Sequence, residues 1–327
     1  MKKLKFGIMG AGRIAKKFAA AAKDTECAEV IAVSSKDRER AEKFADENGI
    51  GKSFGSYEEM LALPELDAVY VATTTNYHYE NVMAVLEAGK HVICEKSMVE
   101  TPEHAEKIFA FSKKKGLFVM EAMWSRFLPA VKQAKKWIDD RLIGEVCTAQ
   151  CEIGFTPPRA ADNRYFSNKL GGGALLDIGV YGFEILTFLI GQKLLDVKTI
   201  AYMSEETGVD CTNLLALRFE KCIASVISTF LADPADRITI SGDHGHIEIN
   251  NPMQGKESVL YLKGRDPEIF SDPGRNGFCY EIEEMCRCVE NGCTESEVIP
   301  HKDTVLCQRV FEICRNENKN NTVKILG

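Results

Sequence analysis

Three side chains in this 327-residue chain have types and positions that suit proton transfer. Lys96 ends the apolar stretch HVICEK, which is typical of a buried strand. Asp177 and Tyr181 are four residues apart in a stretch that favours a helix, so both would lie on one helix face. A nearby cation favours a phenolate, and desolvation lowers the pKa of a lysine, so such a set can move a proton near neutral pH. The residues alone also fit a solvated lysine, a local cap and a packed tyrosine ring.

A glycine motif near the N-terminus suits the binding of phosphate groups. After a short apolar run, Gly10, Gly12 and Ala15 have the spacing of the dinucleotide-binding fingerprint, whose last position accepts alanine. The first glycine permits a tight turn, and the second lets a pyrophosphate approach the backbone. The helix expected over residues 13–23 would point its N-terminal amides at the phosphates. Glycines also occur in such turns for structural reasons alone.

The end of the next expected strand, residues 28–34, indicates which nucleotide would bind. An NAD site usually has Asp or Glu about twenty residues after the glycines, to bind the ribose hydroxyls, whereas this strand ends in Ser34, Ser35 and Lys36. Two hydroxyls and a cation suit the 2′-phosphate of NADP, and two arginines follow closely. Asp37 could be the displaced acid of an NAD site, but we favour it as the cap of the next helix. We therefore predict NADP as the cofactor, with NAD possible.

Alternating strand and helix patterns fill the first part of the chain. Apolar runs typical of buried strands occur at residues 28–34, 66–72, 91–94 and 117–120. Units of this length imply a parallel, doubly wound sheet with right-handed crossovers, whose ligands lie beyond the carboxyl ends of the strands. The polar turn from Thr73 to Asn76 would face the cofactor at that edge.

The character of the sequence changes near residue 122, where we place a domain boundary. Strand patterns continue at residues 145–155, 197–203, 214–219, 223–230, 238–242 and 246–249. They predict an open, mostly antiparallel sheet, and two amphipathic helices near the C-terminus are assigned to packing. The predicted fold class is α/β: a Rossmann domain at 1–122 and an α+β domain for substrate binding and dimerisation at 123–327.

Taken in order, the motifs resemble those of the Gfo/Idh/MocA family of NAD(P)-dependent oxidoreductases over nearly the whole chain. The matching pieces are GIMGAGRIA, SSKDRERAEKFA, VATTTNYHYENVMAVLEAGKHVICEKS, EAMWSRFLPA and GGGALLDIGVYGFEIL. Tyr181 stands where members of the family commonly have histidine. This tyrosine, together with the EAMWSRFLPA and GGGALLDIGVYGFEIL stretches, is similar to what is found in the subgroup of dimeric dihydrodiol dehydrogenase, NADP-dependent xylose dehydrogenase and glucose–fructose oxidoreductase.

The resemblance implies roles for individual residues. The lysine of the family's Glu-Lys-Pro motif lies beside the nicotinamide, which implies this place for Lys96, although Ser97 replaces the proline. The expected catalytic residues are Lys96, Tyr181 and Asp177. The expected cofactor-binding residues are Gly10, Gly12, Arg13, Ile14, Ser34, Ser35, Lys36, Thr73, Thr74, Asn76, His78, Glu95 and Lys96. The expected substrate-binding residues are Trp124, Arg126, Phe155, Asp177 and Tyr181.

These inferences predict an NADP-preferring oxidoreductase that transfers hydride between the nicotinamide and a hydroxyl-bearing carbon of a sugar, polyol or cyclic diol. Oxidation of an alcohol releases the hydroxyl proton as hydride leaves, so the protein must supply a proton acceptor. Two alternatives stay open. One is a non-catalytic NADP-binding sensor, against which the presence of all three catalytic residue types argues. The other is an NAD-dependent glycosidase of the same fold, which would be expected to hold its nucleotide tightly.

Composition sets the remaining expectations. A formal net charge of −7 argues against a nucleic-acid partner or an anionic membrane surface. Charged residues interrupt the N-terminal apolar stretch, and we expect no later run to approach the roughly 18 apolar residues of a membrane span, so we predict a cytoplasmic protein. The twelve cysteines lack zinc-type spacing, which predicts reduced thiols and no metal site. An open sheet with one uncovered face predicts a homodimer.

Overall fold

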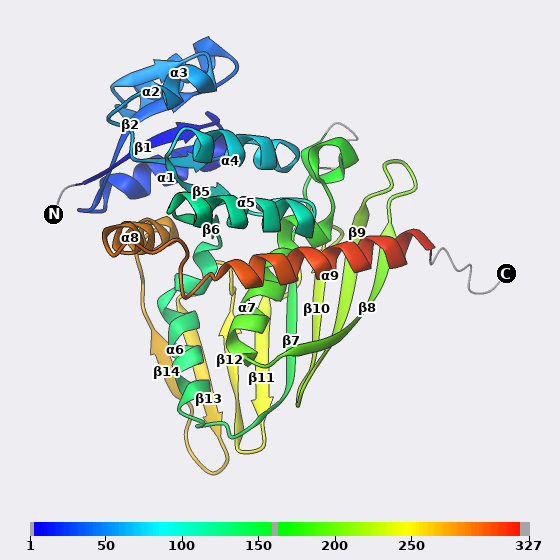
Figure 1. Cartoon of the computed structure of the whole chain (residues 1–327). Coiled ribbons are helices and arrows are strands. Elements are labelled where there is room, and N and C mark those ends of the chain that lie inside the picture. Colours follow the sequence, from blue (N-terminus) through cyan, green and yellow to red (C-terminus); the bar gives the residue numbers. More distant parts are fainter. Residues whose placement is uncertain (1–2, 159–162, 321–327) are drawn as a thin grey trace. The chain divides into compact units, whose positions relative to one another are not determined.

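A computed structural model describes residues 3–158 and 163–320 of the chain (Figure 1). The chain forms two compact units. The first consists of Met1–Trp124 and Arg275–Val305, and the second of Ser125–Gly274 and Leu306–Gly327. We expected a single boundary near residue 122. The observed division differs from it in one segment, because residues 275–305 return to the first unit after the chain has formed the second sheet.

The first unit is built on a six-stranded sheet in the order β3-β2-β1-β4-β5-β6. The strands are β1 (Leu4–Met9), β2 (Ala28–Ser34), β3 (Lys52–Phe54), β4 (Ala68–Val71), β5 (His91–Glu95) and β6 (Val119–Ala122). All neighbouring strands pair in parallel. The chain builds β1, β2 and β3 toward one edge of the sheet, and β4, β5 and β6 toward the other. Open parallel sheets bind ligands where the strand order reverses in this way. The predicted Rossmann fold is confirmed.

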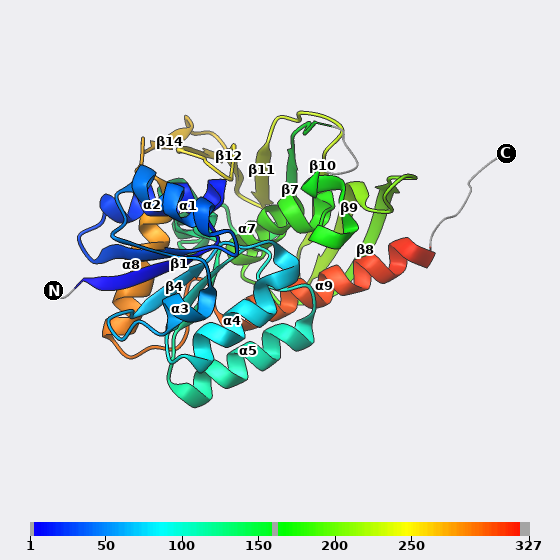
Figure 2. The same ribbon diagram turned by 90° about the horizontal axis from the view of Figure 1, so that it is seen from above.

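Helices cover both faces of this sheet, as Figure 2 shows for α1 and α4. The helices of the first unit are α1 (Arg13–Lys23), α2 (Arg38–Asn48), α3 (Tyr57–Leu61), α4 (His78–Glu87), α5 (Pro102–Lys115) and α8 (Gly277–Glu290), with a 3₁₀ turn η1 (Thr75–Tyr77). Phe18 of α1 stacks on Tyr70 of β4, with ring centroids 3.9 Å apart. The sheet is therefore buried on both sides, which explains why its strands are continuous apolar runs.

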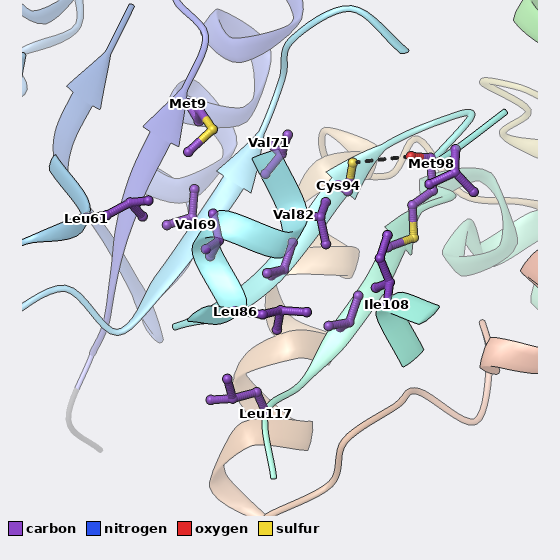
Figure 3. Packing of buried hydrophobic residues seen from close by; sticks show 14 of the residues in the cluster. Met9, Leu61, Val69, Val71, Val82, Leu86, Cys94, Met98, Ile108 and Leu117 are labelled. Carbon is purple, nitrogen blue, oxygen red and sulfur yellow. Dashed lines mark hydrogen bonds between the residues drawn. The ribbon is translucent and has the colours of Figure 1, made fainter. Parts of the chain in front are cut away.

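The core between the sheet and α3, α4 and α5 consists of aliphatic and sulfur-containing side chains (Figure 3). Val69, Val71 and Cys94 point from the strands toward Val82 and Leu86 of α4, and all five are fully buried. Burying one such aliphatic side chain stabilises the fold by roughly 1.5–3 kcal/mol. This core holds the ends of β4 and β5 in place, and the loops that follow them carry several of the predicted site residues.

The segment 275–305 is bound into the first unit by polar contacts as well as by packing. Asn276 caps α8 and donates a hydrogen bond to the Lys17 carbonyl at 3.3 Å. The buried carboxylate of Glu121, on β6, accepts hydrogen bonds from the Met98 amide and the Thr304 hydroxyl, both at 2.8 Å. Thr304 lies 183 positions from Glu121 in sequence, which is why the domain boundary could not be predicted from the order of the motifs.

The second unit contains an eight-stranded sheet in the order β14-β13-β12-β11-β7-β10-β9-β8 (Figure 1). Its strands are β7 (Val146–Gly154), β8 (Leu194–Met203), β9 (Asp210–Phe219), β10 (Ile223–Thr229), β11 (Arg237–Gly242), β12 (Gly245–Asn250), β13 (Glu257–Leu262) and β14 (Glu268–Ser271). All pairings are antiparallel except that of β10 with β7. The open, mostly antiparallel sheet is confirmed, and β13 and β14 extend it beyond the predicted strands.

One face of this second sheet is covered by helices. They are α6 (Pro129–Asp139), α7 (Val180–Ile190) and the part of α9 (His301–Asn320) that follows residue 305. Phe183 of α7 meets Phe311 of α9 edge to face, with ring centroids 5.9 Å apart. On the opposite face, Ile200 is 72% exposed and Tyr202 is 64% exposed. The sheet therefore has one buried face and one accessible, partly apolar face.

The described residues include one stretch, Asn168–Ile190, that is long and apolar enough to cross a membrane, contrary to our expectation that no such run exists. Within the second unit, 83% of its most apolar window is buried. Its apolar side chains are buried against the rest of the unit, as in the core helix of a globular unit.

The turn after β1 gives a first prediction. Gly10 has φ +105°, and a Cβ there would lie 2.8 Å from the Ala72 carbonyl oxygen, so Gly10→Ala combines backbone strain with a clash. We expect it to lower the free energy of unfolding by about 1–3 kcal/mol in urea titration. Gly12→Ala is the matched control, because no atom lies within 4 Å of its Cβ position, and its effect should stay within about 1 kcal/mol. Equal stabilities of the two variants would contradict this account.

Candidate active site

The turn from β1 into α1 presents free backbone amides at a helix N-terminus. Gly12 is the N-cap residue of α1, with φ −100°, and the first turn of the helix contains no acidic side chain. A helix N-terminus without its own acid favours an external anion, and the space beside Gly12 is open. Arg13, which follows, is exposed. This geometry suits the predicted pyrophosphate contact of Gly10, Gly12, Arg13 and Ile14.

The residues after β2 differ in their accessibility. The Ser34 side chain is fully buried, and its hydroxyl donates a hydrogen bond to the Ile8 carbonyl at 3.4 Å. Asp37 caps α2 by accepting from the Arg40 amide at 3.1 Å, which confirms its interpretation as a cap. Lys36 is exposed, and its Nζ lies 4.7 Å from the centroid of the Tyr77 ring. The accessible cation beside the end of β2 is therefore Lys36, whereas Ser34 is a part of the sheet.

A buried histidine connects the loops that follow β4 and β5. The ring nitrogens of His78 lie 3.0 Å from the Ser97 carbonyl and 3.0 Å from the Thr73 carbonyl, and the residue is 1% exposed. Desolvation lowers the pKa of His78, and the charge of Lys96 acts in the same direction, whereas the hydrogen bonds to the Thr73 and Ser97 carbonyls raise it. His78 was predicted to bind the cofactor, and in the structure its ring lies between the loops that follow β4 and β5.

The loop after β4 is further organised by short polar contacts. The Asn81 amide donates to the Thr73 hydroxyl at 2.9 Å, and the Thr74 hydroxyl donates to the Asn76 side-chain oxygen at 2.7 Å. Threonine and asparagine side chains commonly stabilise turns in this way. The positions of Thr73, Thr74 and Asn76 are thus set before any ligand binds.

Lys96 stands at the carboxyl end of β5 and is half-buried. The preceding residue, Glu95, is 7% exposed and accepts a hydrogen bond from the Tyr70 hydroxyl. Its carboxylate is therefore turned into the first unit, where it anchors the strand end. The peptide bond between Lys96 and Ser97 is cis. Among the predicted residues of the first unit, the structure brings together Lys96, Glu95, His78 and Thr73 at neighbouring strand ends.

In the second unit, Asp177 lies in a π-helical turn, η5 (Leu175–Gly179), which leads directly into α7. A π turn closes i to i+5 hydrogen bonds, so the α-helical spacing that we assumed between Asp177 and Tyr181 does not hold over its first part. Such turns frequently occur at functional sites. Tyr181 lies in the first turn of α7 and is 8% exposed.

An arginine that the sequence analysis did not select binds Asp177. The Arg164 Nη1 donates to Asp177 Oδ1 at 3.1 Å, and the Arg164 guanidinium lies 4.1 Å from the centroid of the Tyr165 ring. Desolvation opposes the charged guanidinium, but Asp177 and Tyr165 outweigh it and raise the pKa of Arg164. The pair orients the Asp177 carboxylate. Its only sequence signal is a single arginine in the NRYF stretch before the glycines.

Aromatic rings form a cluster beside this turn. Phe155 meets Tyr165 and Phe230 edge to face, with ring centroids 5.2 Å and 5.3 Å apart. Phe155 is half-buried, and Ile178 from the π turn joins the same apolar cluster. An aromatic wall next to an oriented carboxylate suits a ligand with both an apolar face and hydroxyl groups. The placement of Phe155 is compatible with the substrate contact predicted for it.

Two other predicted substrate residues are held by the protein itself. Trp124 stacks on Phe278, with ring centroids 5.7 Å apart, and is half-buried. Arg126 is fully buried, and its Nη2 lies 2.5 Å from Glu184 Oε2. Because removal of one partner from a buried ion pair leaves an uncompensated charge, this geometry favours a structural role for Arg126 over substrate contact.

Asp210, at the start of β9, fixes the beginning of the π turn. Its Oδ2 accepts from the Leu175 amide at 2.7 Å. Gly173, with φ +117°, leaves room for it, because a Cβ there would lie 2.3 Å from Asp210 Oδ1. Burial raises the pKa of the Asp210 carboxyl to about 7, although the amide hydrogen bonds and the charge of Arg315 lower it. The three-glycine stretch therefore leaves room for the Asp210 carboxylate of β9.

Within residues 3–158 and 163–320, no group of three or more His, Cys, Asp and Glu side chains is arranged to hold a metal ion.

The chain matches known oxidoreductases over almost its full length. Residues 4–123 match the NAD-binding Rossmann model of the GFO/IDH/MocA oxidoreductase family, and residues 131–248 match a C-terminal domain model of that family. Over 324 residues the chain is 32% identical to trans-1,2-dihydrobenzene-1,2-diol dehydrogenase of Mus musculus, covering 95% of this chain and 96% of that protein.

Solved structures agree with this result. Aldose-aldose oxidoreductase from Caulobacter crescentus, complexed with glycerol, superimposes with a TM-score of 0.90 at 25% identity, over 99% of this chain and 100% of that chain. Levoglucosan dehydrogenase, in a complex with NADH and levoglucosan, has a TM-score of 0.89 at 20% identity, with 98% of each chain covered. At 20% identity, the likeness to levoglucosan dehydrogenase shows a shared fold alone.

The Asp210 contact gives a prediction about stability. Asp210→Ala leaves the Leu175 amide without its acceptor, which should lower the free energy of unfolding by about 1–3 kcal/mol. Asp210→Asn retains a side-chain oxygen and should cost clearly less. Because the folded-state pKa is raised to about 7 from the ordinary 3.8, the native state holds this proton more tightly than the unfolded state. The contribution of Asp210 is therefore fully present below about pH 4 and is lost as the pH rises to about 7.

The measurement is urea unfolding of wild type, Asp210→Ala and Asp210→Asn at pH 5 and pH 7.5. The wild type should lose more stability between these values than Asp210→Asn does. An identical pH dependence of the two proteins would show that Asp210 does not titrate in this range.

Proposed function

The chain belongs to the GFO/IDH/MocA family of NAD(P)-dependent oxidoreductases, and from that premise we propose that it is an NADP-preferring dehydrogenase of cyclic diols or closely related sugars and polyols. The observation that carries the proposal is the 32% identity to a dihydrodiol dehydrogenase across both units. Lys96, Asp177 and Tyr181 are present in the motifs where the family resemblance places them. The oriented carboxylate of Asp177 and the aromatic cluster beside it suit a diol on a ring.

The nicotinamide accepts or supplies the hydride when it is bound, and the chain's own residues have to orient the substrate and move a proton. We assign proton acceptance to Tyr181, with Lys96 favouring its phenolate by positive charge. Asp177, oriented by Arg164, accepts hydrogen bonds from a substrate hydroxyl. The bonds of His78 to the loops after β4 and β5 support the position of Lys96.

The direct test is the change in absorbance at the reduced-nicotinamide wavelength with NADP or NAD and a panel of trans-cyclic diols, aldoses and open polyols. Turnover of cyclic diols with NADP is the expected result. Tight NADP binding without turnover of any panel member would favour the sensor alternative. Turnover of glycosides with retained nucleotide would favour the glycosidase alternative.

The proposed acid–base pair gives a prediction for catalysis. Tyr181→Phe and Lys96→Met should each lower kcat by roughly 10²–10⁴, which is the usual contribution of a positioned acid or base. The double variant should lose much less than the product of the two effects, because groups that act as one unit fail together. Steady-state kinetics with the best panel substrate and nucleotide titrations measure these quantities. Near-normal kcat in Tyr181→Phe, with NADP binding intact, would show that the tyrosine only packs.

The preference for NADP rests on the exposed Lys36 and on the use of Asp37 as a helix cap. Lys36→Ala should weaken NADP binding about ten- to a hundredfold, because a charge-assisted contact to the 2′-phosphate is lost, and should leave NAD binding nearly unchanged. Arg38→Ala is a matched control, since Arg38 is also exposed but pairs with Glu42 at 3.0 Å. Isothermal titration calorimetry measures both nucleotides. Equal losses of NADP and NAD in Lys36→Ala would contradict the assignment.

We also propose that the accessible face of the second sheet binds a second copy of the chain. Ile200, Leu214 and Ile227 are cross-strand neighbours on β8, β9 and β10, and Tyr202 extends this apolar patch. An exposed apolar patch of this kind marks an association surface. Symmetric pairing of two such faces would cover it.

Light scattering at micromolar concentration should therefore give the mass of a dimer for the wild type. Ile200→Asp should shift it to monomer, because the new charge would be buried at the interface. Ile269→Asp is the control, since Ile269 is similarly exposed, at 63%, but lies on β14 at the other end of the sheet. A wild-type monomer would contradict the proposal.

A further inference from the structure

Two cysteines are neighbours in the first unit, away from the residues assigned to the nucleotide and the substrate. Cys27 immediately precedes β2 and is half-buried, and Cys286 lies on α8 and is 9% exposed. The Cys286 thiol donates a hydrogen bond to the Cys27 carbonyl oxygen, with sulfur and oxygen 3.4 Å apart. Each of the two thiols also shifts the pKa of the other, so the two side chains are close neighbours. Residues 259 positions apart in sequence thus form a thiol pair.

The pair is electronically asymmetric. The neighbouring Cys286 thiol lowers the pKa of Cys27 to about 7, while desolvation and the charge of Glu283 oppose this. The Cys27 amide and the Thr25 hydroxyl also favour the thiolate. Cys27 in turn raises the pKa of Cys286, which is more buried and donates its proton to the Cys27 carbonyl. A partly exposed thiolate beside a second thiol is the arrangement of a redox-sensitive site.

Other buried cysteines differ from Cys27. Desolvation raises the pKa of Cys94, Cys151 and Cys288, so these thiols stay protonated at neutral pH. Cys147 and Cys293 are exposed, so their thiols are more accessible to solvent than the half-buried Cys27 thiol. Accessibility alone would make those two the first to react, whereas thiolate character and a resolving partner favour Cys27.

We propose that Cys27 and Cys286 form a peroxide-responsive pair that closes reversibly to a disulfide. The Cys27 thiolate attacks one oxygen of hydrogen peroxide, so that an S–O bond forms, the O–O bond breaks and hydroxide leaves. The Cys286 sulfur then attacks the sulfur of the Cys27 sulfenic acid; an S–S bond forms, the S–O bond breaks, and the departing oxygen leaves as water with the Cys286 proton. In sum, two thiols lose two electrons and hydrogen peroxide becomes two waters.

The product would tie the start of β2 to α8. α8 belongs to the segment that returns from the second unit, so the bond would lock that segment onto the first unit. A dithiol reductant would reopen it by exchange. The inference does not depend on the substrate or the cofactor proposed above.

The primary test uses the reduced wild-type chain and stoichiometric hydrogen peroxide at neutral pH, followed by alkylation and non-reducing peptide mapping. We expect a cross-linked peptide containing Cys27 and Cys286, with Cys147 and Cys293 still alkylated. Dithiothreitol should restore both thiols. Oxidation of Cys147 or Cys293 before Cys27, or a disulfide from Cys27 to any other cysteine of the folded chain, would overturn the proposal.

Two variants separate the roles of the partners. In Cys286→Ser, Cys27 should accumulate as a sulfenic acid that dimedone traps, and no intramolecular disulfide should form. The midpoint of the pH profile for alkylation of Cys27 by iodoacetamide should be near pH 7 in the wild type and shift upward in Cys286→Ala, which has no donor at this position. Cys147→Ser is the matched control and should change neither result. An unshifted midpoint in Cys286→Ala would overturn the proposed activation of Cys27.

Discussion

The arrangement of the first unit's site depends on one buried imidazole. His78 lies between the Thr73 carbonyl after β4 and the Ser97 carbonyl after β5, 3.0 Å from each. In a parallel sheet the loops at the carboxyl ends of neighbouring strands converge, but they have no ladder of their own to hold them. A side chain that serves both loops supplies this link. Burial lowers the pKa of the ring, and the hydrogen bonds to the two carbonyls oppose this shift.

In the second unit, a carboxylate rather than an imidazole holds the segment that carries a predicted catalytic residue. The π turn that carries Asp177 begins at Leu175, whose amide is bound by the carboxylate of Asp210 from β9. Gly173 is needed because a side chain there would occupy the place of that carboxylate. Arg164 then orients Asp177 from outside the helix. In both units the loop or turn that carries a predicted catalytic residue is held by residues from other elements, so the sequence motif around that residue describes only part of the site.

This explains which features could be predicted from the sequence. Gly10, the run of short apolar strands and the alternation in the second half are local patterns, and they predicted both sheets and the cap at Asp37. Contacts between distant segments leave no periodic signal. Arg164, Asp210 and the buried partner of Arg126 were missed for that reason. The π turn was missed because the stretch around it is apolar on nearly every face, so an extra residue in one turn produces no visible shift of a stripe.

The return of residues 275–305 has the largest consequence of these distant contacts. A boundary drawn at residue 122 divides the chain once, whereas the folded first unit needs a segment made after the second sheet is complete. Glu121 shows why that segment is required, because its buried carboxylate is satisfied in part by Thr304. A chain cut before residue 275 would leave this group without one of its donors and would expose the face of α1 that packs on α8. The first unit is therefore not formed by the N-terminal residues alone, because it includes the segment 275–305.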